Sequence, residues 1–388
     1  MSPIWSNQSG EWFRAAFVEL DLRQRRHRLC TFRARRRRRI RDDFGRPERL
    51  KFGNGAPGAV EMTKTKLRVF PAIPRNPDSA KYIDELMRIA RLSDRNGFAG
   101  ILLFAGNDTL VEPWSIAQHI LAHTAESSPL IAVNPIYMHP FTVAKFVSSL
   151  ALLYHRKVYL NMITGTATSD LQGLGEQLSH QDRYSRLGEF IHLVRQLLAS
   201  TRPVTFNGKF YTTNNLQLRP GLRPALMPEF LIAGQSDDAR RVAKQMGCLM
   251  MQMLPPNLEE GINAPGVNFG IFAREDCDQA RREAKLFFQD SAEKRELLKY
   301  TMENTDSVWK RRLNEAGQKG ELHENGYWLL PFLTFQADCP YLVGSYAEIG
   351  AKLRRFAEMN VSTIILDVVA DEQELDHVGK ALASSGVF

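Results

Sequence analysis

The sequence predicts an α/β protein built as a (β/α)8 TIM barrel with insertions. From residue 66 onward, short runs rich in Val, Ile and Leu alternate with amphipathic stretches of helical spacing. Near-continuous apolar strands separated by helices are typical of parallel strands that are buried on both faces. Eight such units fit a barrel, a fold that takes about 250 residues and tolerates more. An open doubly wound sheet usually has a glycine-rich turn after its first strand, and "FPAIPRNPDS" has none.

Each apolar run is an expected strand. In chain order they are "LRVFPAI", "GILLFAG", "LIAVNP", "VYLNMITG", "EFLIAGQ", "CLMMQM", "VNFGIFA" and "STIILDVVA". After the first strand, Tyr82, Leu86 and Ile89 share one apolar helical face, and Gly97 suits the end of that helix. Further helices are expected at "PWSIAQHILAHT", "PFTVAKFVSSLALLYHRK", "RYSRLGEFIHLVRQLLAS", "SDDARRVAKQMG" and "DEQELDHVGKALA".

Three segments between these units are expected insertions or irregularities. "VTFNGKFYTTNNLQL" predicts a β-hairpin that turns at Asn207 and Gly208. Only a short helix fits after the sixth strand, in "PPNLEEGINA". A long charged helical region is expected around "DQARREAKLFFQDSAEKRELLKY".

The excess positive charge lies in one terminal segment. Residues 1–61 hold fifteen Lys+Arg and seven Asp+Glu, which accounts for the net charge of +8 of the whole chain. "RQRRHRLCTFRARRRRRIR" is compatible with non-specific binding to nucleic acid or an anionic surface, or with a solvated tail. We favour Met62 as the natural start, because ordered-looking patterning begins just after it. The predicted domains are therefore an arginine-rich extension, 1–61, and a barrel, 62–388.

Composition excludes several classes of protein. No apolar stretch reaches the roughly 18 residues that a membrane-spanning helix needs, so no membrane partner is expected. Cys30, Cys248, Cys277 and Cys339 lie far apart, without metal-ligand spacing to histidine. A disulfide framework and a metal site are not expected. A reduced, cytoplasmic location fits best.

The most informative segment follows the fourth strand. "VYLNMITG" ends in polar residues, so Asn161 and Thr164 can point into the mouth of the barrel, where the carboxyl ends of strands build active sites. A small-residue loop follows, and His180, Arg183 and Tyr184 then open a helix. A histidine in that position is also common as a cap or a surface residue. Spacing alone leaves both interpretations open.

"NMITGTATSDLQGLGEQLSHQDRYSRLGEF" resembles the corresponding segment of the flavin-dependent monooxygenases related to bacterial luciferase, and most of all the alkanesulfonate monooxygenases. The shared pattern is Asn-x-x-Thr-Gly at a strand end, then His-x-x-Arg-Tyr. "FNGKFYTTNNLQLRPGLRPALMPEFLIAGQSDDARRVAKQMG" and "DRNGFAGILLF" match two further blocks in the same order. The resemblance covers the chain from about residue 66 to the C-terminus, and none of the arm.

The resemblance implies a site for flavin mononucleotide (FMN). Its phosphate would bind at the helix start after strand five, where a helix dipole favours negative charge. The expected cofactor-binding residues are Asn161, Thr164, His180, Arg183, Tyr184, Gly234, Gln235 and Ser236. Ser236 also fits an ordinary N-cap. His180 and His139 are the candidate proton-transfer residues, although a histidine at a helix start is more often structural. "LQGLGEQ" and residues 289–327 are candidate lids.

Several positions depart from the alkanesulfonate monooxygenases. Ile73 stands where they carry a His, Leu110 or a neighbour where they carry a Cys, and Asn268 and Gly270 where they carry Arg-x-His. The loop "LTFQADCPYLVGS" also lacks their Arg. Burying a sulfonate without a cation costs several kcal/mol, so a non-sulfonate substrate is expected. The expected pocket is apolar, lined by Phe70, Phe104, Tyr137, Asn268 and Phe335, unless these aromatic side chains only fill the barrel.

By resemblance, the enzyme would use reduced FMN and O2 to oxygenate a small organic molecule. A separate NAD(P)H:flavin reductase is expected, because no pyridine-nucleotide fingerprint is present. A homodimer or higher homo-oligomer is also implied. The alternatives are a deazaflavin-dependent dehydrogenase or reductase on the same barrel, and a catalytically silent flavin-binding relative. The arm leaves a third alternative, a protein that binds nucleic acid non-specifically.

Overall fold

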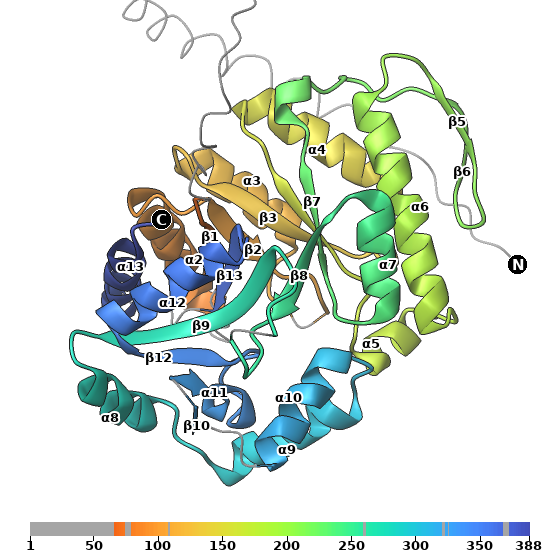
Figure 1. Ribbon diagram of the computed structural model, residues 1–388. Coiled ribbons are helices and arrows are strands. Elements are labelled where there is room, and N and C mark those ends of the chain that lie inside the picture. The colour runs from red at the N-terminus through yellow and green to blue at the C-terminus, as the bar shows by residue number, and fades with distance from the viewer. Residues whose placement is uncertain are drawn as a thin grey trace, which may run out of the picture. The chain divides into compact units, whose positions relative to one another are not determined.

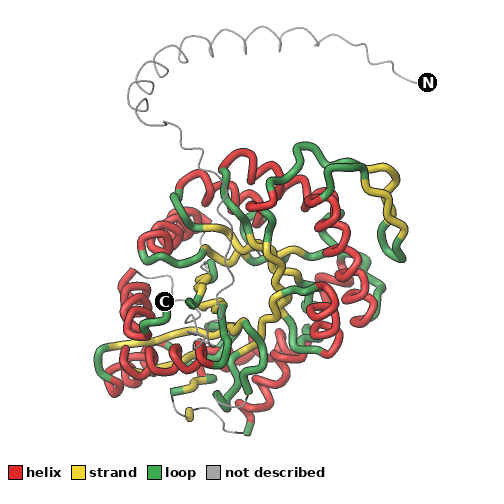
Figure 2. Tube along the Cα trace, turned by 45° about the horizontal axis from the view of Figure 1, so that its top comes forward, coloured by secondary structure: helices red, strands yellow, loops and turns green. Residues whose placement is uncertain are grey.

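Parallel strands close into a barrel, which confirms the predicted fold class (Figure 1). Each barrel strand pairs with the barrel strand that follows it in the sequence, so that β4 pairs with β7 and β9 pairs with β13. The last strand, β13, pairs with β1, and a bridge between Ala72 and Leu102 joins β1 to β2. Figure 2 shows the strands as a ring surrounded by helices. Among the described residues the barrel strands are β1 (Arg68–Pro71), β2 (Gly100–Leu103), β3 (Ser128–Val133), β4 (Tyr159–Met162), β7 (Glu229–Ala233), β8 (Leu249–Met253), β9 (Gly266–Arg274) and β13 (Thr363–Asp367).

The computed structural model describes residues 66–73, 79–107, 109–258, 261–319, 323–324, 326–367 and 372–388. The predicted arginine-rich extension and the expected start at Met62 lie outside these residues. Cys248, Cys277 and Cys339 are reduced and are not part of a disulfide. Within the described part of the chain, no helix combines the length and the apolar character that crossing a membrane requires.

Helices cover the outside of the barrel, and their starts follow from local capping. Ser179 and Ser236 each accept a backbone N–H three residues ahead, and Glu112 caps a helix that begins at Pro113. Gly97 and Gly247, both with positive φ, follow helix ends as expected. The outer helices are α2 (Ser79–Arg95), α3 (Pro113–His123), α4 (Pro140–Tyr154), α6 (His180–Ala199), α7 (Asp237–Met246), α12 (Tyr346–Glu358) and α13 (Glu372–Ser385).

Side chains fill the inside of the barrel as well as its outer face. An inner layer packs across the ring and consists of Phe70, Leu102, Leu130, Leu231, Met251 and Ile365, all buried. The side chains that alternate with these face the helices and belong to the larger outer core. Burial on both faces explains why the strands are nearly continuous apolar runs.

The structure adds detail to one expectation about helices and corrects another. The long charged helical region consists of two helices, α8 (Cys277–Phe287) and α9 (Ala292–Glu303). They are separate because Phe288 is buried against Phe272 and Tyr341, and Ser291 then caps the second helix. The short helix expected after the sixth strand is absent from described residues 254–258 and 261–265, which form turns and bends.

An extension beside β9 was not predicted. β9 is long enough to pair with β13 through its first half and with β12 (Tyr341–Ser345) through its second half. β11 (Tyr327–Trp328) and β10 (His323–Glu324) continue this sheet outward. The helices α10 (Val308–Gln318) and α11 (Leu330–Leu333) complete the region between α9 and β12.

The predicted hairpin is present, as β5 (Val204–Asn207) and β6 (Thr212–Leu216). Its turn spans residues 208–211 and is longer than expected. The carboxylate of Glu189 on α6 accepts the backbone N–H groups of Lys209 and Phe210, at 2.8 and 2.9 Å. A helix side chain therefore sets the shape of this turn. The remaining short helices are α5 (Thr168–Gly173) and the 3-10 helix η1 (Pro224–Leu226).

Candidate functional site

Asn161 lies near the carboxyl end of β4, beside Leu231 of β7 and Ala132 of β3 in the strand register. It alternates with Leu160 and Met162, which pack in the outer core, so its side chain faces the inside of the barrel. Its side chain is buried, with only 6 % of the residue exposed, and its Oδ1 atom has no hydrogen-bond partner. A buried carbonyl oxygen without a partner is uncommon in a native structure, and a bound ligand or water can supply the missing donor.

Three hydroxyl groups converge at the start of α7. Tyr184, from the first turn of α6, is buried, and its phenol is within hydrogen-bonding reach of the side chains of Thr164 and Ser236. Burial raises the pKa of Tyr184 above its ordinary value, in spite of those two bonds. The phenol therefore stays protonated and available as a donor at any physiological pH.

Gly234 leaves room for this arrangement. A Cβ atom at Gly234 would lie 2.6 Å from the Tyr184 hydroxyl and 2.9 Å from the Ala239 Cβ. Both neighbours are buried, so neither can give way easily. Because Gly234 has no side chain, the space beside the backbone between β7 and α7 stays free. An anion would approach the start of α7 through this space.

The start of α7 carries two carboxylates, which at first sight disfavour an anion. Asp237 is fully exposed and pairs with Arg240 at 2.9 Å. Asp238 pairs with Arg241 at 2.7 Å and lies 3.4 Å from Nδ1 of His180. The hydrogen bond from Arg241, and then that from His180, holds the pKa of Asp238 below its usual value. Each carboxylate is thus compensated by a neighbouring cation or histidine, and the N-terminal N–H groups keep their favourable dipole.

Arg183 has a different partner from the one the resemblance implies. Its guanidinium is buried and forms an ion pair with Asp306, in the segment between α9 and α10, while its Nε has no partner. Arg183 therefore fastens the region after β9 to α6.

The segment between β4 and the first candidate lid contacts the second candidate lid. Asn304 accepts hydrogen bonds from the hydroxyl of Thr168 and the N–H of Ser169, at 2.6 and 2.8 Å, and Ala167 forms a bridge with Thr305. Gly165 starts this loop with a φ of +76°, and a Cβ there would lie 3.0 Å from the amide nitrogen of Asn134. The loop after β4 is thus held on both sides.

His139 is used by the local structure. It caps α4 by accepting the N–H of Phe141 at 3.1 Å, and its ring packs edge-on against Tyr211 of the loop between β5 and β6. Burial lowers the pKa of His139, which favours the neutral ring that this cap requires. The structure brings His180, and not His139, beside Tyr184, with ring centroids 5.0 Å apart.

The five residues expected to line a substrate pocket differ in burial. Phe70 is fully buried and packs edge-on against Tyr159, which belongs to the inside of the barrel. Phe104, just after β2, and Asn268, within β9, are half-buried, whereas Tyr137 and Phe335 are partly exposed in separate loops. Phe70 therefore fills the barrel, the alternative left open by the sequence.

A cavity of about 540 Å³ lies between α7, the loop joining β8 to β9, and α10. We call it the α10 cavity. Among the residues expected to bind the cofactor, only Gln235 lines it. Sequence reasoning missed the rest of the lining, because α10 was treated as either a lid or a plain charged helix. Its lining residues are Gln235, Arg240, Met250, Gln252, Met253, Leu254, Pro255, Pro256, Gly261, Asn263, Ala264, Trp309, Arg312, Leu313, Glu315, Ala316 and Lys319.

The arrangement can hold a molecule with a polar, anionic end at α7 and a body over β4. Ser236, Tyr184 and Thr164 supply hydroxyl donors, and Asn161 supplies a buried acceptor. No group of three or more His, Cys, Asp and Glu side chains in the described part of the chain is arranged to hold a metal ion.

Comparison with known proteins places this geometry in a family. A 4-(gamma-L-glutamylamino)butanoyl-[BtrI acyl-carrier protein] monooxygenase from Niallia circulans is 28 % identical over 321 residues, which cover 80 % of this chain and 94 % of that protein. The oxygenating constituent of 3,6-diketocamphane monooxygenase from Pseudomonas putida, solved in complex with FMN, superposes with a TM-score of 0.60 at 14 % identity, over 83 % of this chain and 98 % of that one.

An F420-dependent secondary alcohol dehydrogenase, in complex with an F420–acetone adduct, superposes with a TM-score of 0.59 at 16 % identity, over 83 % of this chain and 99 % of that one. At such identities the structural likeness shows the fold alone. The sequence model of the luciferase-like monooxygenases matches residues 65–363, most of the chain. The chain therefore belongs to the luciferase-like monooxygenase family of enzymes, as its strand-four and helix-six motifs predict.

Proposed function

We propose that this enzyme is the oxygenating component of a two-component system that uses reduced FMN and O2. The observation that carries the proposal is the convergence of the Tyr184, Thr164 and Ser236 hydroxyls at the start of α7. A phosphate binds well where hydroxyl donors and the N-terminal N–H groups of a helix point to one place. We also propose His180 and Gln235 as further residues that contact the bound FMN.

The described residues fit FMN as a whole. The phosphate would be held by Ser236 and Tyr184, in the space that Gly234 leaves open. Asn161 and Thr164 would meet the ring or the polyol chain, and the unpartnered Oδ1 of Asn161 would gain a donor there. When bound, reduced FMN supplies the two electrons that let one atom of O2 enter the substrate while the other leaves as water.

The chain's own contribution is to bind, orient and exclude water. The contacts of Asn304 and Asp306 hold the loop after β4 and the α9–α10 segment together. A closed cover of this kind keeps bulk water from the reacting atoms. His180 can hold or move a proton at Nδ1, where it already meets the Asp238 carboxylate. We propose it, ahead of His139, as the proton-transfer residue.

The proposed substrate is a small organic molecule and not a sulfonate. Ile73 is buried in the outer core, Asn268 is uncharged, and the loop before β12 carries no arginine. A buried sulfonate at this place would lack a compensating cation. We propose a separate flavin reductase as the electron donor, and a homodimer as the working form.

The test is an anaerobic fluorescence titration of the whole chain with reduced FMN, oxidised FMN and a deazaflavin in parallel. We expect the tightest binding for reduced FMN. Tyr184→Phe should weaken it by about tenfold, as expected for one lost hydrogen bond to a charged group. Tyr300→Phe, which changes an exposed phenol on α9, is the matched control and should have no effect.

Other outcomes would change the proposal. A preference for the deazaflavin would favour hydride transfer, the chemistry of the F420-dependent neighbour. Binding of flavin without substrate oxygenation would favour a silent relative. Binding of none of the three would contradict the proposed site. NADH oxidation with FMN by the isolated chain would contradict the need for a reductase.

A further inference from the structure

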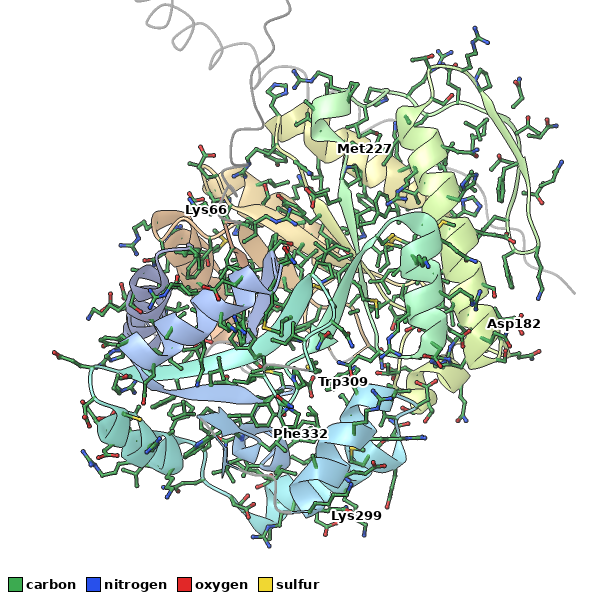
Figure 3. All side chains as sticks on the ribbon, viewed as in Figure 1. Lys66, Asp182, Met227, Lys299, Trp309 and Phe332 are labelled. Carbon is green, nitrogen blue, oxygen red and sulfur yellow. The ribbon has the colours of Figure 1, made fainter. Side chains whose placement is uncertain are left out.

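His180 and Asp238 bring together the starts of two neighbouring helices. His180 is the first residue of α6, and Asp238 is the second residue of α7. Nδ1 of His180 lies 3.4 Å from Oδ2 of Asp238, so the two side chains meet between the helices. Asp182, labelled in Figure 3, lies in the first turn of α6 and marks this end of the helix. Ser236, two residues before Asp238, caps α7 at the place proposed for the flavin phosphate.

The carboxylate of Asp238 is held on its other side. Its Oδ1 accepts a hydrogen bond from Nη2 of Arg241, three residues later in α7, at 2.7 Å. The hydrogen bond from Arg241 is the main reason that the pKa of Asp238 is below its ordinary value, so the carboxylate is ionised at neutral pH. An ionised carboxylate can only accept hydrogen bonds. Oδ2 therefore offers His180 an acceptor in a set position.

This acceptor selects one form of the His180 ring. A neutral imidazole has one N–H donor and one nitrogen with a lone pair, and either ring nitrogen can take either role. Because Asp238 can only accept, its contact with Nδ1 favours the tautomer with the proton on Nδ1 and the lone pair on Nε2. Packing does not make this choice. The His180 side chain is 35 % exposed, and its ring lies 5.0 Å from that of Tyr184, a contact that is similar for both tautomers.

Helix capping does not account for the pair. Ser236 already caps α7, and Ser179 caps α6. A carboxylate in the first turn also interacts favourably with the helix dipole, but Asp237 supplies one at the preceding position. Asp237 is fully exposed, whereas the Asp238 side chain is 26 % exposed and contacts a ring on another helix. The contact with His180 is therefore what distinguishes Asp238 from its neighbour.

We propose that Asp238 is a positioning residue, which holds the proton of His180 on Nδ1 and presents Nε2 to the bound flavin. Nε2 takes up a proton from the flavin or returns one to it, while the Nδ1–H bond stays intact. The positive charge that His180 gains in this step faces the Asp238 carboxylate, which compensates it. Contacts of this kind are often long without a ligand and tighten when one binds. The inference rests on the proposed function, because it assumes that His180 is the proton-transfer residue.

The test is NMR spectroscopy of the whole chain, labelled with 15N at histidine, at about pH 8.5, where a free imidazole is neutral. Long-range 1H–15N correlation distinguishes a protonated ring nitrogen from one with a lone pair. The chain has nine histidines, and His180→Gln identifies the signals of His180 by their loss. We expect the wild type to carry the His180 proton on Nδ1.

Asp238→Asn should move that proton to Nε2. An amide has one acceptor oxygen and one donor NH2 group, and Arg241 retains the oxygen as its partner. The NH2 group then faces His180 and donates to Nδ1, which favours the opposite tautomer. The ratio of the two tautomers should change by about tenfold or more. Asp237→Asn makes the same change one position earlier, at a carboxylate that pairs with Arg240, and should leave the ratio unchanged.

Reduced FMN, added without oxygen, gives a second readout that locates the ligand. It should shift the Nε2 signal of the wild-type His180 more than the Nδ1 signal, because Nε2 is the nitrogen that meets the flavin. Fluorescence titration should still detect binding of reduced FMN to Asp238→Asn, since Asp238 contacts His180 and not the phosphate.

Three results would overturn the proposal: a wild-type His180 with its proton on Nε2, the same tautomer in wild type and Asp238→Asn, or no response of Nε2 to bound reduced FMN. The two proposals fail separately. An Nδ1-protonated His180 in a chain that does not bind reduced FMN would reject the proposed function and leave the pair of Asp238 and His180 intact. Tight binding of reduced FMN with the proton on Nε2 would reject this inference alone.

Discussion

The two ends of the barrel use polar residues in opposite ways. At the amino end, Glu229 receives Arg68 at 2.7 Å and Lys157 at 2.6 Å, and both cations also lie over the ring of Tyr159. On β4, two residues after Tyr159, Asn161 is more deeply buried, and its Oδ1 has no hydrogen-bond partner. The charged side chains named at the amino end thus have partners inside the protein, whereas Asn161 Oδ1 at the carboxyl end has none.

This difference separates stability from binding. A buried polar group with partners inside the protein contributes to folding, and one without partners costs free energy until a ligand supplies them. In a TIM barrel the carboxyl end carries the active site and the amino end serves stability. The predictions below test this division, from the largest expected effect to the smallest.

Asp306→Ala should produce the largest loss of stability. Arg183 is 7 % exposed in its side chain, so removing its partner leaves a buried charge uncompensated. We expect the free energy of unfolding to fall by about 3 kcal/mol. Urea denaturation measures it. Asp278→Ala, which breaks an exposed pair with Arg281, is the control and should cost almost nothing. Equal effects would show that Asp306 has no special role.

Asn161→Leu should weaken flavin binding without weakening the fold. Loss of a buried acceptor that meets the ligand corresponds to about 1–3 kcal/mol, or roughly 5- to 150-fold in affinity. The unfolding free energy should stay constant or rise, because an unpartnered polar atom is removed. Fluorescence titration and thermal unfolding measure the two quantities. Unchanged flavin affinity would contradict the assignment of ligand binding to the carboxyl end of the barrel.

Glu229→Gln should have the reverse effect, lower stability with unchanged flavin affinity. Burial acts to raise the pKa of Glu229, but hydrogen bonds from Lys157 and Arg68 outweigh it and hold the pKa below its ordinary value of 4.5. Its contribution is therefore complete above that value and is lost as pH falls through the lower folded pKa. Because the side chain is 40 % exposed, we expect about 1 kcal/mol at neutral pH.

The pH dependence provides the check on Glu229. Unfolding curves of wild type and Glu229→Gln should differ at pH 7 and converge toward pH 3. A difference that grows as pH falls would contradict the assigned ion pairs.

Asp237→Asn should have the smallest effect, about twofold tighter binding of FMN. Asp237 is fully exposed at the start of α7, so its charge acts on a bound phosphate only through solvent. Titration at low and high salt measures this effect, which should disappear at high salt. A larger change in affinity would mean that Asp237 contacts the ligand directly.

Much of the site could be predicted from local sequence. Ser236 is a cap by its position before an apolar-patterned helix, and Tyr184 lies at the start of another expected helix. Asn161 ends an apolar run, which places it at the mouth once the strands are parallel. These inferences hold because capping and strand alternation depend on residues that are close in the chain.

The sequence by itself determined the barrel and the order of its strands along the chain. The resemblance of its motifs implied that the Tyr184 segment meets the start of α7, as the structure shows. Only the tertiary structure decided that Arg183 pairs with Asp306, that Phe70 fills the barrel, and that α8 and α9 separate at Phe288. The same holds for the α10 cavity, whose walls come from α7, β8 and α10. The physical reason is that periodicity reports which face of an element is apolar. The partner of a long charged side chain, or of a buried ring, depends on which distant elements pack beside it.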